Sequence, residues 1–132
     1  MTTLVVAAAI LDASGRVLIA ERPAGKHMAG RWEFPGGKVA PGEAEAVALA
    51  RELAEELGIE VLRARPVMRL SHPYPDRTVE LSMWLVESYR GEPQALDGQR
   101  LKWVARTQLG GEDLLEADRP FVAALVQWPS PP

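Results

Sequence analysis

The stretch "GKVAPGEAEAVALARELAEELGI", residues 37–59, decides how the rest of the chain is interpreted. Over residues 43–57 its apolar side chains recur with the period of a helix. Within that helix Glu52, Glu55 and Glu56 stand at i, i+3 and i+4, so that their carboxylates share one face. Like charges at this spacing cost a helix roughly 0.2–0.5 kcal/mol per pair. Folding alone therefore gives no reason for the cluster.

A divalent cation would remove this repulsion. Carboxylates are hard oxygen ligands that suit Mg²⁺ or Mn²⁺, and magnesium completes its shell with water and substrate phosphates. The pair Gly36–Gly37 just before the helix can bend the chain so that a backbone carbonyl points at the acidic face. A carboxylate left off the metal could accept a proton from an attacking water. A solvated helix face is the alternative explanation for an isolated E-x-x-E-E.

The whole stretch fits a longer pattern, G-x5-E-x7-R-E-U-x-E-E-x-G-U, where U is apolar. Its residues here are Gly37, Glu43, Arg51, Glu52, Leu53, Glu55, Glu56, Gly58 and Ile59. Seven of these positions are fixed, and a chance match at a given start is on the order of one in 10⁸ at average residue usage. This pattern is the Nudix box, and the chain resembles a Nudix hydrolase.

The resemblance extends to the MutT branch, which removes oxidised guanine nucleoside triphosphates. The segments that resemble this branch are "AERPAGKHMAGRWEFPGGK", "YPDR", "LVESYRGEP" and "EADRP". It implies an α/β/α sandwich around a mixed sheet and a Mg²⁺-dependent attack of water within the triphosphate, giving nucleoside monophosphate and pyrophosphate. By the same resemblance the metals are held by the Gly37 carbonyl, Glu52, Glu55 and Glu56, while Arg51 and Glu43 orient the ligands through an ion pair.

Residues outside the box are assigned to the nucleotide by the resemblance. They are Arg22, His27, Phe34, Lys38 and Arg77. Guanidinium groups suit phosphate oxygens or a base edge. Without the family pattern the arginines and Lys38 would be ordinary surface residues, and His27 an ordinary loop histidine.

Two positions depart from the MutT pattern. Asp97 in "ALDGQ" stands where MutT has a glutamate, so its reach toward a metal is shorter by one methylene. Asp118 in "EADRP" stands where MutT has the asparagine that reads the modified base. An ionised aspartate accepts but does not donate, so it repels O6 of 8-oxoguanine unless it is protonated, whereas it suits the exocyclic amine of cytosine. Asp118 could also simply cap the last helix.

The remaining segments predict an α+β or layered α/β/α domain. Residues 4–11 and 16–22 are expected to pair as a hairpin, with a long loop after them and a short extended piece at residues 31–34. Further strands are expected at residues 61–72, 78–91 and 99–106, and a closing helix at residues 116–128. One domain is expected over residues 1–128, followed by the Pro-rich tail 129–132.

Composition limits the possible partners. The net charge is −3, which argues against a nucleic-acid polymer. The absence of cysteine suits a reducing cytoplasm, and the apolar run at residues 4–11 is too short to span a membrane. We expect a cytoplasmic monomer or homodimer that binds a nucleoside triphosphate. The substrates considered are 8-oxo-dGTP first, then CTP or modified dCTP. The alternatives are a nucleotide-binding module without activity, and hydrolysis of a dinucleotide or nucleotide sugar.

Overall fold

The computed structural model describes residues 2–26 and 28–127, so His27 and the predicted tail lie outside the described residues. A four-stranded sheet has the order β4-β1-β6-β5, and a three-stranded sheet has the order β3-β2-β7. The strands are β1 (Thr2–Ile10), β2 (Val17–Glu21), β3 (Trp32–Glu33), β4 (Gly36–Lys38), β5 (Glu60–Tyr74), β6 (Arg77–Arg90) and β7 (Leu101–Val104). The helices are α1 (Glu45–Leu57), α2 (Arg119–Val126) and the short 3₁₀ helices η1 (Arg106–Gly111) and η2 (Glu116–Asp118).

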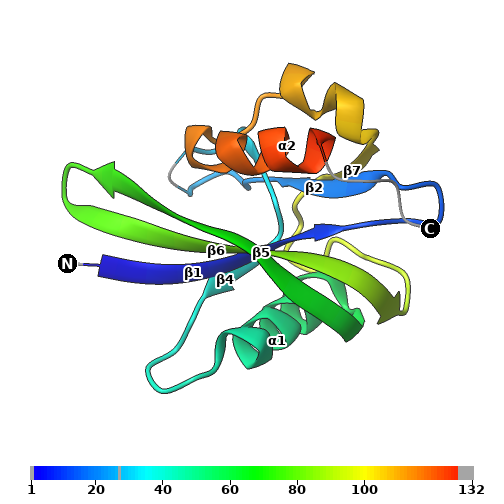
Figure 1. The fold of residues 1–132 in the computed structure, drawn as a ribbon, viewed down its shortest axis with the longest axis horizontal. Helices are drawn as coiled ribbons and strands as arrows, with labels where there is room; N and C mark the ends of the chain where they lie inside the picture. Colours follow the sequence, from blue (N-terminus) through cyan, green and yellow to red (C-terminus); the bar gives the residue numbers. More distant parts are fainter. Residues whose placement is uncertain (1, 27, 128–132) are drawn as a thin grey trace.

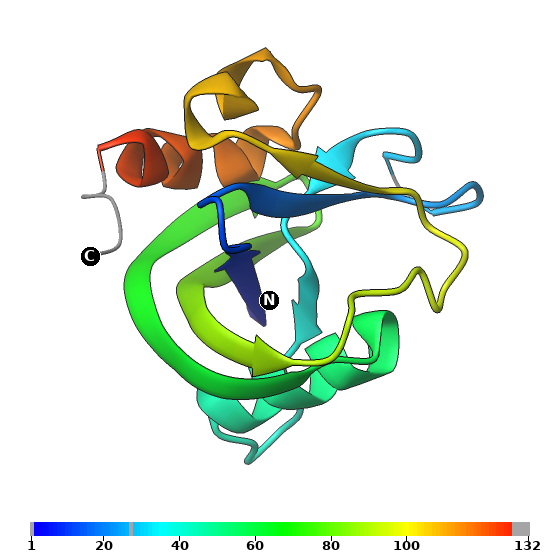
Figure 2. The ribbon, with the colours of Figure 1, turned by 90° about the vertical axis from the view of Figure 1, so that its right-hand side faces the viewer.

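The sheets lie between two helical layers. Helix α1 covers one side, and η1, η2 and α2 gather on the other, with the long strands β5 and β6 curving between them (Figures 1 and 2). Strand β1 runs parallel to β6 and antiparallel to β4, so the larger sheet is mixed. The predicted α+β sandwich around a mixed sheet is confirmed.

Strand β1 is apolar from Leu4 to Ile10, and it is buried on both faces from Val6 onward. Val6, Ala8 and Ile10 pack in a core cluster with the apolar face of α1. Ala7 and Ala9 belong to the opposite cluster, which contains the buried side chains of α2. Strands buried on both faces lose the usual alternation of polar and apolar residues. Strand β1 pairs with the glycine-containing strand β4 and thereby fixes its position.

The predicted N-terminal hairpin is wrong. Strands β1 and β2 belong to different sheets and share a single bridge, Leu11 to Val17, beside the turn. The sequence signal for a hairpin is a turn between two apolar runs, and this signal is the same when the chain crosses from one sheet to the next. The crossing lets β2 pair with β3 and β7 in the second sheet.

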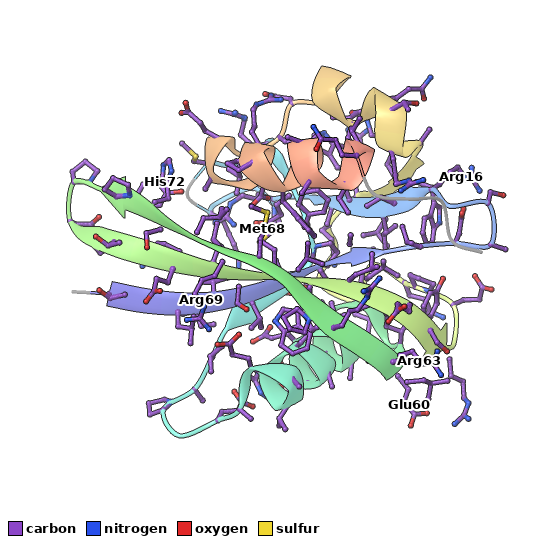
Figure 3. The ribbon with its side chains drawn as sticks, in the orientation of Figure 1. Arg16, Glu60, Arg63, Met68, Arg69 and His72 are labelled. Atoms are coloured by element: carbon purple, nitrogen blue, oxygen red, sulfur yellow. The ribbon has the colours of Figure 1, made fainter. Side chains whose placement is uncertain are left out.

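Strand β5 shows how one edge strand serves both layers. Met68 packs against the cluster on the α2 side, while the next residue, Arg69, pairs with Glu45 of α1 (Figure 3). Successive side chains of a strand point to opposite faces, so this alternation follows directly from the backbone.

Helix α1 begins two residues later than predicted, at Glu45, and ends as predicted at Gly58. Gly58 has a φ of 70° and donates its N–H to the carbonyl of Ala54, which is the expected C-cap geometry. The buried residues of the helix are Ala48, Leu49, Leu53 and Leu57, and they form its apolar face. The opposite face carries the acidic residues. Among the described helices none has the length and apolarity needed to cross a membrane.

Candidate active site

One cleft, with a volume of about 960 Å³, brings together most of the predicted site residues. Those that line it are Arg22, Phe34, Gly37, Lys38, Glu52, Glu56, Arg77, Asp97 and Asp118. A second hollow of about 660 Å³ lies between α1 and β5, and none of the predicted residues lines it. The cleft runs from the acidic face of α1 to Phe34 and Asp118, which come from two segments far apart in the sequence.

The glycine pair before α1 is required by close packing. A Cβ on Gly36 would lie 2.0 Å from the carbonyl oxygen of Val6, and one on Gly37 would lie 2.3 Å from the carboxyl carbon of Glu52. Both residues form part of strand β4, so the expected bend is not what these glycines provide. The missing side chain of Gly36 lets β4 lie close against β1, and that of Gly37 lets the backbone lie directly against the carboxylate of Glu52.

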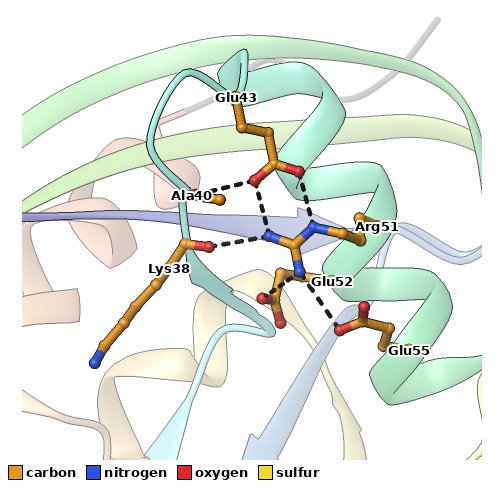
Figure 4. Close-up of polar contacts among 6 residues, drawn as sticks. All are labelled: Lys38, Ala40, Glu43, Arg51, Glu52 and Glu55. Carbon is orange, nitrogen blue, oxygen red and sulfur yellow. Dashed lines mark hydrogen bonds and ion pairs between the residues drawn. The ribbon is translucent and has the colours of Figure 1, made fainter.

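Arg51 organises the charged face of α1 (Figure 4). Its Nε and Nη2 donate to the two carboxylate oxygens of Glu43 at 2.8 and 2.9 Å, and its Nη1 donates to Glu52 at 2.9 Å. Nη2 also reaches the carbonyl of Lys38 at 3.2 Å. These bonds lower the pKa of Glu43 to about 2 and raise the pKa of Arg51. The predicted ion pair is confirmed, and it fixes Glu52 from the side away from the cleft.

Glu56 lies in an unfavourable electrostatic environment. Burial, together with the negative charges of Glu52, Glu33 and Asp97, raises the pKa of Glu56 to about 8, although a backbone hydrogen bond from Gly36 favours the ionised form. Three carboxylates thus act on a fourth along one wall of the cleft. A positive charge at this wall would reverse the effect.

The oxygen atoms of this wall fit a hard divalent cation. Among the described residues no three acidic or histidine side chains converge as closely as a metal-bound set does. Even so, Glu52, Glu56 and Asp97 line the same cleft beside the Gly37 backbone, and their mutual repulsion is what a cation would relieve. Carboxylate and carbonyl oxygens are the ligands that Mg²⁺ and Mn²⁺ prefer.

Glu55 and Lys38 are placed differently from the rest. The side chain of Glu55 is 60% exposed, lies outside the lining of the cleft and contacts Arg51 at 3.5 Å. Lys38 lines the cleft mouth and is exposed. The metal role of Glu55 and the phosphate role of Lys38 both stay predictions.

Asp118 forms the buried end of the cleft. It is 4% exposed and its Oδ2 accepts the backbone N–H of Phe34 at 3.3 Å. The ring of Phe34 packs edge-on against Phe121 of α2 with centroids 5.0 Å apart, which holds this segment in place. Burial raises the pKa of Asp118 to about 7. Asp118 is the N-cap residue of α2, as the alternative interpretation had it, but its side chain makes no cap hydrogen bond.

Arginines line the cleft between the two ends. Arg22 donates through Nη1 to Glu33 at 2.8 Å, and both side chains are less than one-third exposed. Arg77 begins β6 and lines the cleft with Tyr74. A guanidinium carries five N–H donors in a planar fork, and this geometry suits phosphate or base oxygens.

Glu33 and Gln99 also line the cleft, and neither was among the predicted site residues. Glu33 lies in the sequence between the buried aromatic residues Trp32 and Phe34. A charged residue between two buried apolar residues is a sequence signal that an oppositely charged side chain lies close to it. Gln99 is 8% exposed and bonds the backbone of Asp97 and Glu56. No local pattern identifies Gln99, because Glu56 is 43 residues away in the sequence.

Comparison with known proteins gives consistent matches over nearly the whole chain. The family model described as "NUDIX domain" matches residues 6–124. The 8-oxo-dGTP diphosphatase of Escherichia coli is 38% identical over 88% of this chain and 90% of its own length. The CTP pyrophosphohydrolase of the same organism is 39% identical over 96% and 93%. A solved structure from the analysis of MutT of Aliivibrio salmonicida and Vibrio cholerae superimposes with a TM-score of 0.84 and 31% identity, covering 96% of this chain and 98% of that one.

Proposed function

The chain belongs to the Nudix family and is a MutT-like Nudix hydrolase, and we propose that it is a Mg²⁺-dependent nucleoside triphosphate pyrophosphohydrolase. Members of this family generally use divalent metal ions. The reaction adds water across a phosphoanhydride bond and yields nucleoside monophosphate and pyrophosphate. The observation that carries the proposal is the wall of carboxylates beside the Gly37 backbone, at the foot of a cleft large enough for a nucleotide.

The proposed role of each residue follows from its position in the cleft. The cation would be held by the Gly37 carbonyl, Glu52, Glu56 and Asp97. It would neutralise phosphate charge and polarise the reacting bond. Arg51 keeps Glu52 oriented through its bonds to Glu43 and Glu52. A carboxylate of this wall that is not occupied by the cation accepts the proton of the attacking water. Lys38 and Arg77 line the same cleft and would bind phosphate oxygens.

We infer that 8-oxo-dGTP is the preferred substrate, and Asp118 supports this. A carboxyl group with a pKa of about 7 is largely protonated below neutral pH. In that form it donates through its hydroxyl and accepts through its carbonyl, as the asparagine amide of MutT does. It can then donate to O6 and accept from N7–H of 8-oxoguanine. The similarity to the Escherichia coli 8-oxo-dGTP diphosphatase agrees with this choice.

Cytosine nucleotides are the second candidate, and the same residue favours them in its ionised form. An aspartate carboxylate accepts from the exocyclic amine of cytosine. The similarity to the CTP pyrophosphohydrolase extends over 96% of this chain. The two candidates therefore differ in the protonation state of one buried side chain.

The deciding experiment measures kcat/KM with Mg²⁺ for 8-oxo-dGTP, dGTP, CTP and 5-methyl-dCTP under identical conditions. We expect 8-oxo-dGTP to exceed dGTP by about 10-fold or more, the effect of one well-placed base contact. Preference for the cytosine nucleotides would replace the first candidate by the second. Absence of pyrophosphate release from every nucleotide, with either Mg²⁺ or Mn²⁺, would leave a nucleotide-binding module.

A further inference from the structure

The loop that contains Asp97 is fastened to the end of helix α1. The last carbonyls of a helix have no partner within the helix and must find one elsewhere. Here the carbonyl of Leu57 accepts the backbone N–H of Gln94 at 2.9 Å, and that of Glu56 accepts the N–H of Leu96 at 3.1 Å. The loop between β6 and β7 thus completes the C-terminal end of the helix that carries the carboxylates.

Gln99 adds a side-chain bridge to this junction. Its Nε2 donates to the carbonyl of Glu56 at 3.3 Å, and its Oε1 accepts the backbone N–H of Asp97 at 3.0 Å. The side chain connects the backbone of one wall residue to that of another. It is 8% exposed, whereas Asp97 itself lies at the exposed surface of the cleft.

The chemistry of the bridge requires an amide. One partner is an acceptor and the other is a donor, and an uncharged carboxamide offers both groups at its end. A carboxylate in this position would face the carbonyl of Glu56 with negative charge. Asparagine carries the same groups but is one methylene shorter. A buried polar side chain that uses both of its functions in this way is costly to replace by an apolar one.

We propose that Gln99 is a positioning residue that sets Asp97 against Glu56, so that both carboxylates can serve one cation. This rests on the proposed function, since it assigns Asp97 and Glu56 to the metal. Gln99 itself does not touch the cation or the substrate. Its effect passes through the Asp97 backbone, and loss of the bridge lets the loop carry Asp97 away from the wall.

The test compares Gln99→Met, which conserves volume and removes both hydrogen bonds, with Gln94→Leu. Gln94 lies in the same loop and is exposed, and its bonds to Leu57 and Leu96 use its backbone N–H and carbonyl, both of which leucine keeps. In the metal-free protein, NMR-detected hydrogen exchange at the Asp97 amide should rise at least about 5-fold in Gln99→Met, the loss expected for one hydrogen bond. Mn²⁺ affinity, followed through the electron paramagnetic resonance of the free ion, should fall about 10-fold. Both should stay at wild-type values in Gln94→Leu.

A double-mutant cycle separates positioning from a general structural effect. In an Asp97→Asn background, Gln99→Met should change kcat and Mn²⁺ affinity by less than about 2-fold, because the group it positions has already lost its charge. Full additivity of the two substitutions would overturn the proposal, as would unchanged Asp97 exchange and Mn²⁺ affinity in Gln99→Met.

A second variant keeps the test decisive if Gln99→Met does not fold. Gln99→Asn retains the amide but is too short to reach both partners, and unchanged Mn²⁺ affinity in this variant would also overturn the proposal. Exchange and Mn²⁺ binding need no turnover. A wild-type protein that hydrolyses no nucleotide would therefore contradict the proposed function while these two measurements still decide the role of Gln99.

Discussion

At the α1 end of the cleft the side chains are held by several polar bonds from residues close in the sequence, whereas at the Asp118 end a single buried carboxyl group bonds a residue far away in the sequence. Arg51 bonds Glu43, Glu52, Glu55 and the carbonyl of Lys38, all within 13 residues of it. Asp118 bonds Phe34, which is 84 residues away. The comparison indicates that the proposed catalytic carboxylates of α1 are specified by local spacing, and the proposed base-reading residue by the tertiary fold.

The largest effect should come from the carboxylates of the α1 end. Glu52→Gln and Glu56→Gln each remove one negative oxygen without changing shape, and each should lower kcat/KM by more than about 100-fold, since loss of an outer partner alone costs 10- to 100-fold. Steady-state pyrophosphate release measures this. Glu60→Gln, which alters an exposed pair with Arg90, is the control.

These substitutions should leave the fold intact. Removal of a repelling charge beside Glu56 should hold or raise the melting temperature, as measured by circular dichroism without metal. Near-normal turnover in both variants would contradict the metal assignment and would remove the basis for treating this end as catalytic.

Arg51→Lys tests whether the bonding network of the α1 end matters beyond its charge. Lysine keeps the positive charge but cannot hold Glu43 in a two-point contact and reach Glu52 and the Lys38 carbonyl at once. We expect kcat/KM to fall by about 10- to 100-fold, with a higher Mg²⁺ concentration needed for half-maximal activity. An unchanged Mg²⁺ dependence would show that Arg51 does not orient metal ligands.

The Asp118 end should respond to pH in a way that the α1 end does not. The ratio of kcat/KM for 8-oxo-dGTP to that for CTP should fall by about 100-fold from about pH 6 to about pH 8, because the protonated fraction of a group with a pKa near 7 falls about 10-fold while the ionised fraction rises about 10-fold. Groups that affect both substrates equally cancel in this ratio. In Asp118→Asn the ratio should be independent of pH, and a ratio that still varies would assign the effect to another group.

Stability gives an independent control on Asp118. Its pKa in the folded protein lies above the ordinary value of 3.8, so the folded state keeps the proton longer than the unfolded chain does. The contribution of Asp118 to the free energy of unfolding therefore decreases as pH rises from about 4 to about 7 and is constant above that. Urea denaturation of wild type and Asp118→Asn should diverge over this interval, by at most about 4 kcal/mol.

The sequence predicts the α1 end better than the Asp118 end for a physical reason. The carboxylates and Arg51 lie on successive turns of one helix, so a fixed spacing predicts their common face before any fold is known. The partners of Asp118 and Gln99 depend on how distant segments pack. Asp at the start of a helix is equally typical of a cap, and the spacing gives no way to choose between cap and buried base reader.

Strand order shows the same limit. The predicted hairpin of β1 and β2 has the correct strands and the wrong pairing, because apolar runs identify strands without identifying the sheet that each enters. Parallel pairing of β1 with β6 joins residues more than 70 positions apart, from Thr2 with Thr78 to Ile10 with Val86. The residue pattern alone left an α+β domain and a layered α/β/α domain both open, and the MutT resemblance implied the sandwich around a mixed sheet.

The smallest effect is expected for substitution of Glu55. This substitution tests whether the sequence spacing or the observed geometry better predicts which carboxylates of α1 are needed for activity. The Nudix box pattern predicts Glu55 as a metal ligand, like Glu52 and Glu56. However, the side chain of Glu55 is 60% exposed and lies outside the lining of the cleft. An exposed i, i+4 pair with Arg51 contributes about 0.3–0.5 kcal/mol, so Glu55→Gln should lower kcat/KM by only about 2-fold. The measurement is the same Mg²⁺-dependent assay used for Glu52→Gln. A loss as large as that of Glu52→Gln would mean that Glu55 turns from Arg51 toward the cation when the site is loaded, and that the spacing on the helix describes the working site better than the metal-free arrangement does.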